Sequence, residues 1–515
     1  MNMMNDPVGR RAVVIGAGPG GLASAMLLRA AGADVTVLER SDRVGGRTAG
    51  FTQDGFTFDY GPTFYLYPQV LREIFAACGR DLDAEVDLRR LDPMYRLQFD
   101  DGRTFDATAD IDRLTAEAAR LSPEDAPNVR RYLETNATKF DSFIPILQRP
   151  FLGLGDLMRR DMLAALPNLR PWSSVDTDLK RWFRDPDLRL AFSFQSKYLG
   201  MSPFKCPSLF TIIAHVEYGH GVFHPIGGCN AIPQAMARIA TEMGVDIRLS
   251  EPAEEIGFDG RRATSVRTKT GTIPADAVVV NGDFAGTIPS LIPDARRKRW
   301  TDARIAAKKY SCSTFMLYLG IEGRLDDLAH HTIFMSDDYQ ENIREIDAGL
   351  APEEPTIYVQ NAGVTDPTLA PEGHSTLYIL VPTGNLSGKV DWPAIAPAYR
   401  EKVLDRVSRL SGHDIRPRIR TERMLTPADW QAQMGIHRGA TFNLAHNLGQ
   451  MLHFRPRNRF EDVDGVYLTG GGTHPGSGLP TIFESAKIAA RLAGDDMGLD
   501  PADYAIPDRE REAAE

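Results

Sequence analysis

The sequence has no long apolar run. None of its stretches approaches the roughly 18 consecutive apolar residues that a membrane-spanning helix needs. The N-terminal MNMMNDPVGRR is short and polar and lacks the apolar core of a secretory signal. We therefore expect no transmembrane helix and no export, and a protein that stays in the cytoplasm, where it is made.

Cysteine is scarce, with four residues in a chain of 515. They are scattered and never form a CxxC pair, which argues against a disulfide framework and against a redox pair of that type. The four are Cys78, Cys206, Cys229 and Cys312. We expect them to be free thiols in a reducing compartment.

Basic residues are in the minority, with 59 Lys and Arg against 69 Asp and Glu and a formal net charge of -10. A protein that neutralises nucleic-acid phosphates needs a dominant basic surface, so no nucleic-acid partner is expected.

The length of the chain, 515 residues, exceeds what one hydrophobic core organises. It predicts two or three domains.

The sequence also lacks His and Cys residues at the spacing of a standard metal site. His215, His220, His224 and Cys229 lie close together in the sequence, but their spacing fits no standard zinc pattern. Glycines between them would interrupt any helix that placed the histidines on one face. We expect no metal site.

Glycine is abundant at two junctions between a strand and a helix. The first lies in AVVIGAGPGGLASAMLLRAAGADVTVLER, which begins at Ala12. Residues 12–15 are read as a buried parallel strand, 22–31 as a helix of small residues and 34–38 as a second strand. Strand, glycine loop, helix and strand therefore follow one another in the order of a dinucleotide-binding unit.

Each glycine of this first unit has a mechanical role. Gly16 permits the tight turn, Gly18 lets a pyrophosphate approach the backbone, and Gly21 lets helix and strand pack closely. The helix N-terminus offers unpaired N–H groups and a partial positive charge to the phosphate. Glu39 lies 21 residues after Gly18, where a carboxylate accepts hydrogen bonds from a ribose. The unit predicts dinucleotide binding.

Two more glycine turns follow, in RSDRVGGR at 40–47 and FDYGPT at 58–63. This arrangement resembles the large flavoprotein family that includes amine oxidases, protoporphyrinogen oxidase and carotenoid desaturases. The resemblance implies that the dinucleotide is FAD. It places Gly45-Gly46-Arg47 along the FAD diphosphate and Gly61-Pro62-Thr63 near the flavin.

The second glycine-rich junction lies near the end of the chain, in GVYLTGGGTHPGSGLPTIFESAKIAARLAG from Gly465. Residues 466–469 are read as a strand, and a helix follows from about Pro480, a residue suited to a first helical turn. A helix N-terminus aimed at the flavin ring would stabilise the negative charge of the reduced form near N1 and C2=O. The two ends of the chain are thus expected to meet on one cofactor.

This C-terminal stretch resembles the bacterial-type carotenoid (phytoene) desaturases, through GTHPG at 472–476 and GLP at 478–480. Three further segments resemble the same group: FDYGPT at 58–63, GVFHPIGG at 221–228 and VVNGD at 279–283. They are collinear over nearly the whole chain.

The first glycine-rich unit and the family resemblance together give the expected cofactor-binding residues. They are Gly16, Gly18, Pro19, Gly20, Gly21, Glu39, Arg40, Gly46, Arg47, Gly61, Pro62, Thr63, Ala253, Gly471, Gly472, Thr473, Leu479, Pro480 and Ile482. The resemblance alone puts Ala253 near the adenine.

The expected fold class is α/β, with a discontinuous Rossmann-type FAD-binding domain and an inserted mixed α+β substrate domain. The predicted FAD-binding segments are 1–75, 221–300 and 456–500, with further strands at 245–249, 262–269 and 272–280 and a helix at 231–243. The predicted substrate domain comprises 76–220 and 301–455, and 501–515 is read as a polar tail.

An aromatic-rich stretch precedes residue 224. It contains Phe192, Phe194, Tyr198, Phe204, Phe210, Tyr218 and Phe223. These residues suit either a packed core or the wall of a long apolar tunnel, and the sequence does not separate the two interpretations.

Residues 140–172 interleave apolar side chains with arginines, and prolines at 145, 150 and 167 cut the segment into short pieces. This pattern is typical of an interfacial anchor, with the apolar side in the lipid and the arginines at the headgroups. An amphipathic cap on the substrate domain is the alternative. A peripheral association with the membrane surface is therefore one expectation of the sequence.

The resemblance implies an FAD-dependent desaturase of a long polyisoprenoid, such as phytoene or a related precursor. Hydride would pass to flavin N5 and a proton to a base or water, so the flavin carries the chemistry and the protein positions the substrate. No base is named by the sequence. Candidates are Glu217, His215, His220 and Glu484.

Other functions of the same fold stay open. Isomerisation, saturation and oxidation of a terminal methyl group act on similar substrates. A flavin amine oxidase fits the C-terminal stretch less well. A prenyl-binding escort protein without catalysis is disfavoured, because such proteins have lost the FAD fingerprint that this chain keeps. Oligomeric state and electron acceptor are not predicted.

Overall fold

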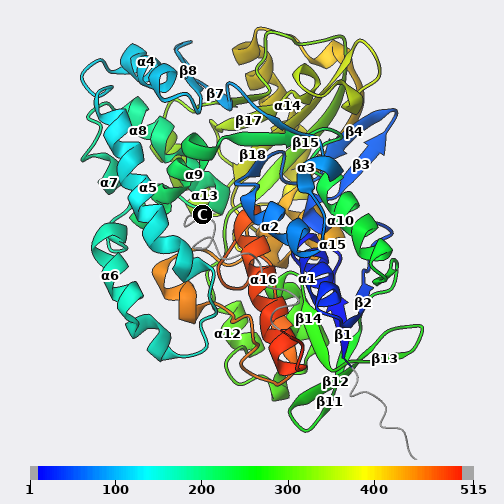
Figure 1. Ribbon diagram of the computed structural model, residues 1–515. Coiled ribbons are helices and arrows are strands. Elements are labelled where there is room, and N and C mark those ends of the chain that lie inside the picture. The colour runs from blue at the N-terminus through cyan, green and yellow to red at the C-terminus, as the bar shows by residue number, and fades with distance from the viewer. Residues whose placement is uncertain (1–9, 501–515) are drawn as a thin grey trace, which may run out of the picture.

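A parallel five-stranded sheet forms the lower half of the molecule in the view of Figure 1. The structure is a computed structural model that describes residues 10–500, so the polar tail expected at 501–515 lies outside the described residues. In spatial order the strands are β10 (Asp246–Arg248), β2 (Asp34–Leu38), β1 (Arg11–Ile15), β14 (Ala277–Val280) and β20 (Val466–Leu468). Neighbours pair in parallel throughout. Segments from the start, middle and end of the chain thus share one sheet.

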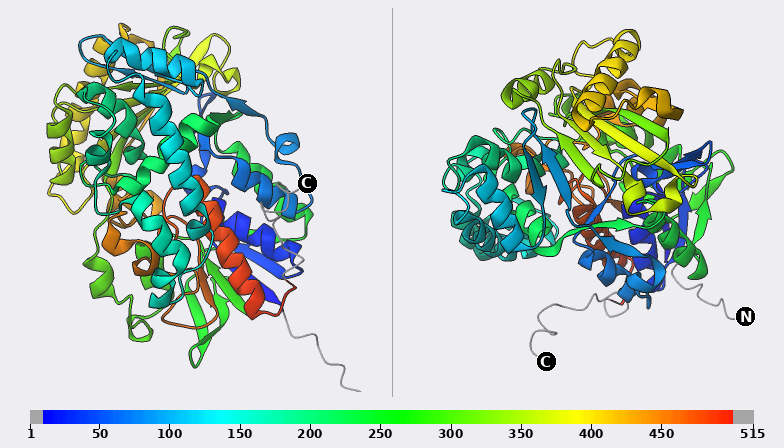
Figure 2. Two further views of the ribbon diagram at one scale, coloured as in Figure 1. Left: turned by 60° about the vertical axis from the view of Figure 1, so that its left-hand side comes forward. Right: turned by 90° about the horizontal axis from the view of Figure 1, so that it is seen from above.

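Helices α1 (Pro19–Ala30) and α16 (Leu479–Asp496) lie side by side on one face of this sheet. In the left view of Figure 2 they are the blue and red helices. Their contact is rich in alanine, including Ala23, Ala486 and Ala490, whose small side chains let the two helices approach closely. Helices α2 (Gln69–Ala77) and α10 (Ala231–Glu242) pack beside α1 in the same core.

The opposite face is covered by a small antiparallel sheet and by α11 (Phe284–Leu291). The small sheet contains β11 (Glu255–Asp259), β12 (Arg262–Arg267) and β13 (Thr272–Pro274). The sequence predicted a single strand over 272–280, but β13 and β14 belong to different sheets. Pro274 ends the first because proline has no N–H for a ladder, and Asp276 between them pairs with Arg11.

The upper half contains a seven-stranded sheet. Its strands, in spatial order, are β19 (Ile419–Leu425), β15 (Ser313–Glu322), β18 (His374–Thr383), β17 (Ile357–Gln360), β16 (His331–Phe334), β7 (Tyr95–Gln98) and β8 (Thr104–Ala107). All pairs are antiparallel except β16 with β7. Helix α14 (Trp392–Ser411) covers one face. The hairpin of β3 (Gly50–Gln53) and β4 (Phe56–Asp59) packs on the other.

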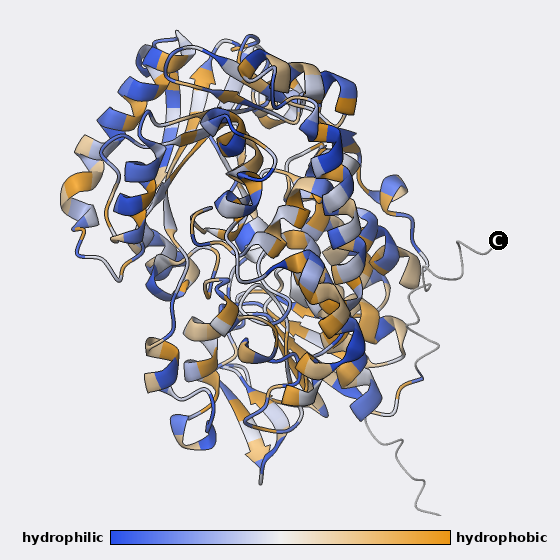
Figure 3. Ribbon diagram, turned by 90° about the vertical axis from the view of Figure 1, so that its left-hand side faces the viewer, coloured by the Kyte–Doolittle hydropathy of each residue, from blue (hydrophilic) through white to orange (hydrophobic). Residues whose placement is uncertain are grey.

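A helical lobe flanks both sheets on the left of Figure 1. It contains α4 (Ile111–Leu121), α5 (Asn128–Leu147), α6 (Arg160–Leu169), α7 (Val175–Leu179), α8 (Pro186–Ser193), the 3-10 helix η3 (Phe194–Leu199) and α9 (Ile212–His220). Its helices are banded with hydrophilic and hydrophobic residues in Figure 3, as expected where one face is buried. A short sheet of β5 (Tyr65–Leu66), β9 (Val222–Pro225) and β6 (Leu88–Arg90) connects the lobe to the lower half.

Among the described residues, no helix combines the length and the apolar character that a membrane crossing requires.

Candidate cofactor and substrate site

A cavity of about 860 Å³ receives side chains from both large sheets and from the helical lobe. One end lies at the carboxyl ends of β1 and β2, where Ile15 and Leu38 contribute to its lining. Open parallel sheets bind ligands at this edge. The other end is lined by the seven-stranded sheet, including Ile333 and Thr356, and by η3. One space thus connects the predicted cofactor site with the predicted substrate domain.

The N-terminus of α1 opens into this cavity without a capping side chain. Gly18 is the N-cap residue, and Gly18, Pro19 and Gly20 line the space. A buried helix end with unpaired N–H groups needs a partner, and an anionic phosphate satisfies it. Gly21 is absent from the lining. A Cβ on Gly21 would lie 2.0 Å from the Gly16 carbonyl oxygen, so this glycine allows the close packing of helix on turn.

Glu39 is buried at the end of β2 and lines the cavity. Its Oε2 accepts a hydrogen bond from the Ala17 N–H at 2.8 Å, and its Oε1 accepts one from the Ser41 N–H at 2.9 Å. Each carboxylate oxygen has further lone pairs. The carboxylate is therefore fixed in place and is still able to accept hydrogen bonds from the hydroxyl groups of a ribose.

The N-terminus of α16 reaches the same cavity, and it too has no capping side chain. Gly478 is the N-cap residue, and Leu479, Pro480 and Ile482 add to the lining. Two uncapped helix ends, about 460 residues apart in sequence, thus open into one space. This arrangement fits a long ligand with an anionic group at each of two points, as FAD has when reduced.

The glycines before α16 do not all face the cavity. Gly471 lines it, whereas Gly472 and Thr473 do not. A Cβ on Gly472 would lie 2.6 Å from the Cβ of Phe284, so Gly472 packs against α11. Thr473 is buried and donates to the Pro456 carbonyl oxygen. Gly472 and Thr473 therefore pack against neighbouring segments beside the cavity and do not line it.

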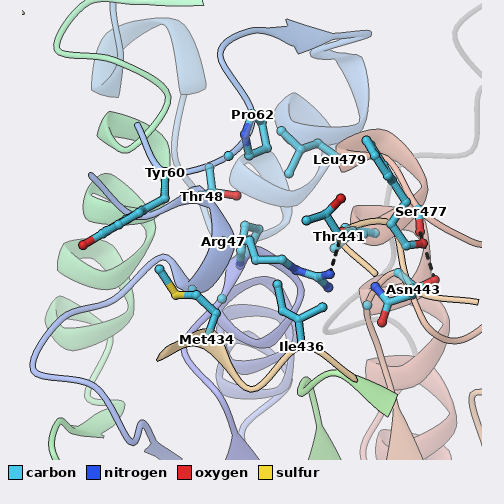
Figure 4. A pocket seen from close by; sticks show the side chains of 18 of the residues that line it. Arg47, Thr48, Tyr60, Pro62, Met434, Ile436, Thr441, Asn443, Ser477 and Leu479 are labelled. Atoms are coloured by element: carbon cyan, nitrogen blue, oxygen red, sulfur yellow. Dashed lines mark hydrogen bonds between the residues drawn. The ribbon is translucent and has the colours of Figure 1, made fainter. Parts of the chain in front are cut away.

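Arg47 extends across the cavity, as Figure 4 shows. Its Nη1 donates to the Thr441 carbonyl oxygen at 2.9 Å. With the Asn443 amide oriented to suit its neighbours, the amide oxygen accepts from Arg47 and the amide nitrogen donates to Asp283 Oδ2. Asp283 also caps α11. A guanidinium held in this way adds positive charge where a diphosphate is expected.

The segment Gly61-Pro62-Thr63 lines the middle of the cavity. A Cβ on Gly61 would lie 2.6 Å from the Arg47 carbonyl oxygen, so only glycine fits this close approach. The Thr63 hydroxyl lies 2.5 Å from the Tyr358 hydroxyl, which lies 2.7 Å from His331 Nδ1. A chain of polar groups therefore leads from this turn into the seven-stranded sheet.

Sixteen of the nineteen predicted cofactor-binding residues line the cavity, and Gly21, Gly472 and Thr473 do not. Ala253, which rested on the resemblance alone, is among the sixteen. Sequence reasoning missed the run from Gln433 to Ile436 and Thr441 to Asn443, which it assigned to the substrate domain. The signal available there was a glycine: Gly435 has a φ of +62°, and a Cβ on it would lie 2.6 Å from Arg40 Nη1.

The end of the cavity away from Glu39 is largely apolar. Its lining includes Met94, Tyr95, Phe194, Lys197, Tyr198, Cys312, Ile333 and Thr356. From the aromatic-rich stretch, only Phe194 and Tyr198 reach the cavity, whereas Phe192 and Tyr218 are buried in the core of the helical lobe. The packed-core interpretation therefore holds for Phe192 and Tyr218, and the tunnel-wall interpretation stays a prediction for Phe194 and Tyr198.

The four candidate bases are placed very differently. His215 and His220 pack with each other and with Phe140, and neither lines the cavity. Glu484 in α16 pairs with Lys487. Glu217 is bonded to a residue of the cavity lining, because its Oε1 accepts from the Tyr198 hydroxyl at 2.8 Å.

Comparisons with known proteins agree with this geometry. The family model described as flavin containing amine oxidoreductase matches residues 19–493. A 4,4'-diapophytoene desaturase (4,4'-diapolycopene-forming) of Methylomonas sp is 41% identical over 93% of this chain and 94% of its own length. An all-trans-zeta-carotene desaturase of Myxococcus xanthus is 39% identical over 96% and 94%.

Solved structures show the same fold at low identity. An oxidoreductase from Methanosarcina mazei has a TM-score of 0.61 at 18% identity, covering 92% of this chain and 98% of its own. Putrescine oxidase bound to putrescine has a TM-score of 0.63 at 16% identity, covering 95% and 99%. The expected α/β fold with a Rossmann-type part is confirmed.

Proposed function

Since the chain belongs to the flavin-containing amine oxidoreductases, in their carotenoid desaturase group, and FAD is its cofactor, we propose that it desaturates a long acyclic polyisoprenoid such as phytoene or a related precursor. The observation that carries the proposal is the single cavity, in which the predicted FAD site continues into a largely apolar end. An extended hydrocarbon gains affinity from such a surface without polar anchors. Amine oxidation is disfavoured by the desaturase relatives.

The residues of the cavity suggest how FAD is held. The N-terminus of α1 and Arg47 would bind the diphosphate, Glu39 the adenosine ribose, and Ala253 would lie beside the adenine. Gly61 to Thr63 and the N-terminus of α16, with Gly471, Leu479 and Ile482, would surround the flavin ring. These assignments rest on the lining of the cavity and on the two uncapped helix ends.

The bound flavin supplies the redox chemistry by accepting a hydride from an allylic carbon. The chain's own residues hold the hydrocarbon in the apolar end and exclude water from it. Developing positive charge is spread over the neighbouring double bonds, so positioning is the main contribution of the protein. The cavity residues that touch the hydrocarbon would be Phe194, Ile333 and their neighbours.

Expression of the chain in a host that accumulates phytoene tests the proposal. Pigment extracts should contain products with more conjugated double bonds and correspondingly fewer hydrogens by mass. Products of unchanged mass would indicate an isomerase, a gain of hydrogen a saturase, and a gain of oxygen a terminal-methyl oxidase. Unchanged phytoene beside a yellow, folded protein would refute the desaturase proposal.

We also propose that the protein loads its substrate at a membrane surface. Within 140–172, side chains of Leu154, Met158 and Trp172 are exposed by 65%, 69% and 71%. Phe454 is exposed on a neighbouring 3-10 helix. Its segment is joined to residues 140–172 by Arg457, which donates to the Leu152 carbonyl oxygen. Exposed apolar groups beside arginines match the boundary between acyl chains and headgroups.

Partition energetics give the reason for membrane loading. Burying ten CH₂ groups is worth roughly 8 kcal/mol, so a long hydrocarbon is almost absent from water and resides in the bilayer. Capture from water would be slow. The overall charge of -10 opposes anionic lipid, so insertion of apolar side chains would supply much of the binding and salt would release the protein only in part.

Flotation with liposomes tests membrane loading. The variant carries Leu154, Met158, Leu163 and Trp172 changed to Ser, all of which are exposed, and leaves the buried Phe151 intact. The parent should float and the variant should remain at the bottom. A matched control changes the exposed Leu249 and Leu350, outside this segment, to Ser and should float as the parent does. Equal flotation of all three would exclude this segment.

A further inference from the structure

Glu217 is a buried carboxylic acid in the helical lobe. It lies in α9 with no exposed surface, and no described Lys, Arg or His forms an ion pair with it. A buried carboxyl group without a cation is unfavourable when ionised. An apolar residue or a glutamine would serve packing better. The presence of an acid at this position therefore calls for a chemical reason.

The hydrogen-bond partners of Glu217 are an amide and a hydroxyl group. From η3, Gln195 Nε2 donates to Oε2 at 2.7 Å and the Tyr198 hydroxyl donates to Oε1 at 2.8 Å. From β7, the Tyr95 hydroxyl accepts from Gln195 Nε2 at 3.3 Å. From α9 itself, the Tyr218 hydroxyl lies 2.9 Å from that of Tyr95. Tyr132 of α5 completes the set of titratable neighbours.

Two members of this network, Tyr95 and Tyr198, also line the apolar end of the cavity. Tyr198 lies beside Phe64, with ring centroids 5.3 Å apart, and Phe64 directly follows Thr63 of the turn expected near the flavin. Tyr198 thus lines the cavity close to this turn, and its hydroxyl is bonded to Glu217. Tyr198 therefore links the apolar end of the cavity to the Glu217 carboxylate.

We propose that Glu217 is the final acceptor of the proton lost in desaturation and that Tyr198 passes the proton to it; this inference rests on the proposed function. After a hydride has left, the substrate is an allylic cation. A neighbouring C–H bond breaks, its electron pair forms the new double bond, and its proton binds Tyr198 Oη. The proton of the Tyr198 hydroxyl moves at the same time to Glu217 Oε1, so Tyr198 stays neutral and Glu217 becomes neutral.

The pKa values of the groups near the cavity favour Glu217 as the proton acceptor. Burial raises the pKa of Glu217 to about 7, while hydrogen bonds from Gln195 and Tyr198 oppose the shift. An acceptor works best when its pKa lies near the operating pH. Burial lowers the pKa of Lys197 to about 8, so its amine is mostly protonated at neutral pH. Burial holds the pKa of His331 well below its usual range, so a proton there would be poorly held.

The activity test compares Glu217→Gln and Tyr198→Phe with the parent, using phytoene supplied in liposomes. The parent's kcat/KM should rise with pH up to about 7 and then level, because Glu217 must be ionised to accept a proton. Glu217→Gln should lower kcat/KM by about 100-fold or more and should remove the dependence of kcat/KM on the pKa near 7. Tyr198→Phe should lose about 10-fold or more in kcat with little change in KM. A Glu217→Gln variant with the parent's rate and pH profile would overturn the proposal.

A matched control is His215→Gln, on the same helix and outside the cavity, which should keep the parent's profile. Glu217→Gln should also fold well. Because the folded-state pKa of Glu217 is raised, its contribution to stability is present below the unfolded pKa and is lost as pH rises through about 7. The melting temperature of Glu217→Gln relative to the parent should therefore increase from pH 6 to pH 8.

A readout without turnover is the infrared band of the protonated carboxyl group. In the FAD-loaded parent the part of this band that belongs to Glu217 should disappear as pH rises through about 7. It is identified as the difference between the parent and Glu217→Gln, because the buried Asp59, with a pKa raised to about 6, contributes to the band in both. Titration near pH 4.5 would overturn the assignment of Glu217. A parent that converts no polyisoprenoid would refute the proposed function instead, and the two failures are therefore distinguishable.

Discussion

The two ends of the cavity are built by different means. At the end expected to hold the cofactor, glycines and two helix N-termini contribute to the surface, with Gly16, Gly18, Gly20 and Gly478 in its lining. At the substrate end, large side chains from η3, β7 and β16 form the surface. A backbone-built surface tolerates little change where an added Cβ would meet backbone, as at Gly16, where it would lie 2.9 Å from the Asn281 carbonyl oxygen. A surface of side chains changes shape with each substitution and tunes selectivity.

The largest expected effect is at the cofactor end, from Gly21→Val. The added Cβ would lie 2.0 Å from the Gly16 carbonyl oxygen, so strand and helix must separate. We expect loss of bound flavin and of most soluble protein, measured by absorbance near 450 nm and by yield. Gly155→Val is the control, because nothing lies within 4 Å of its added Cβ. A yellow Gly21→Val protein would contradict the close packing described above.

Next in size is Glu39→Ala. The substitution removes a buried carboxylate that holds the Ala17 and Ser41 N–H groups. Hydrogen bonds to charged groups contribute about 1.5–3 kcal/mol each, so FAD affinity should fall by roughly 10- to 100-fold. Titration of apoprotein with FAD, followed by flavin fluorescence, measures it. An unchanged Kd would remove Glu39 from the site.

At the substrate end, Phe194→Ala should have a smaller effect of a different kind. Phe194 lines the cavity and packs against Tyr95, with ring centroids 5.7 Å apart. Enlarging this space should raise KM by roughly 3- to 10-fold, since about 2 kcal/mol or less of apolar contact with the substrate is lost. Bound flavin should not change. Phe204→Ala, an exposed aromatic of the same stretch, should behave as the parent.

The smallest expected effect comes from Arg40→Met. Arg40 neighbours Glu39 and lines the same end of the cavity, but it is exposed and water screens its charge. FAD affinity should fall by less than about threefold. Comparing this Kd with that of Glu39→Ala in the same titration tests whether burial decides the difference. A larger loss in Arg40→Met than in Glu39→Ala would reverse the comparison.

The sequence by itself determined the cofactor end. Gly16, Gly18 and Gly21 have roles that follow from local backbone geometry, and Glu39 follows at a fixed spacing. Such features depend on neighbours within some 25 residues, so periodicity and motif reach them. The C-terminal junction could be interpreted in the same way, because Gly478 and Pro480 mark a helix start locally.

Only the tertiary structure decided which side chains line the end of the cavity proposed for the substrate and which candidate base lies beside it. Phe194 and Tyr198 face the cavity while Phe192 and Tyr218 face the core, although all four lie in one aromatic stretch. Glu217 was one of four candidates until folding placed η3 between it and the cavity. Side-chain direction and burial depend on contacts between different elements, such as that of Phe64 with Tyr198. Because local sequence carries no record of those contacts, it could propose these residues but could not choose among them.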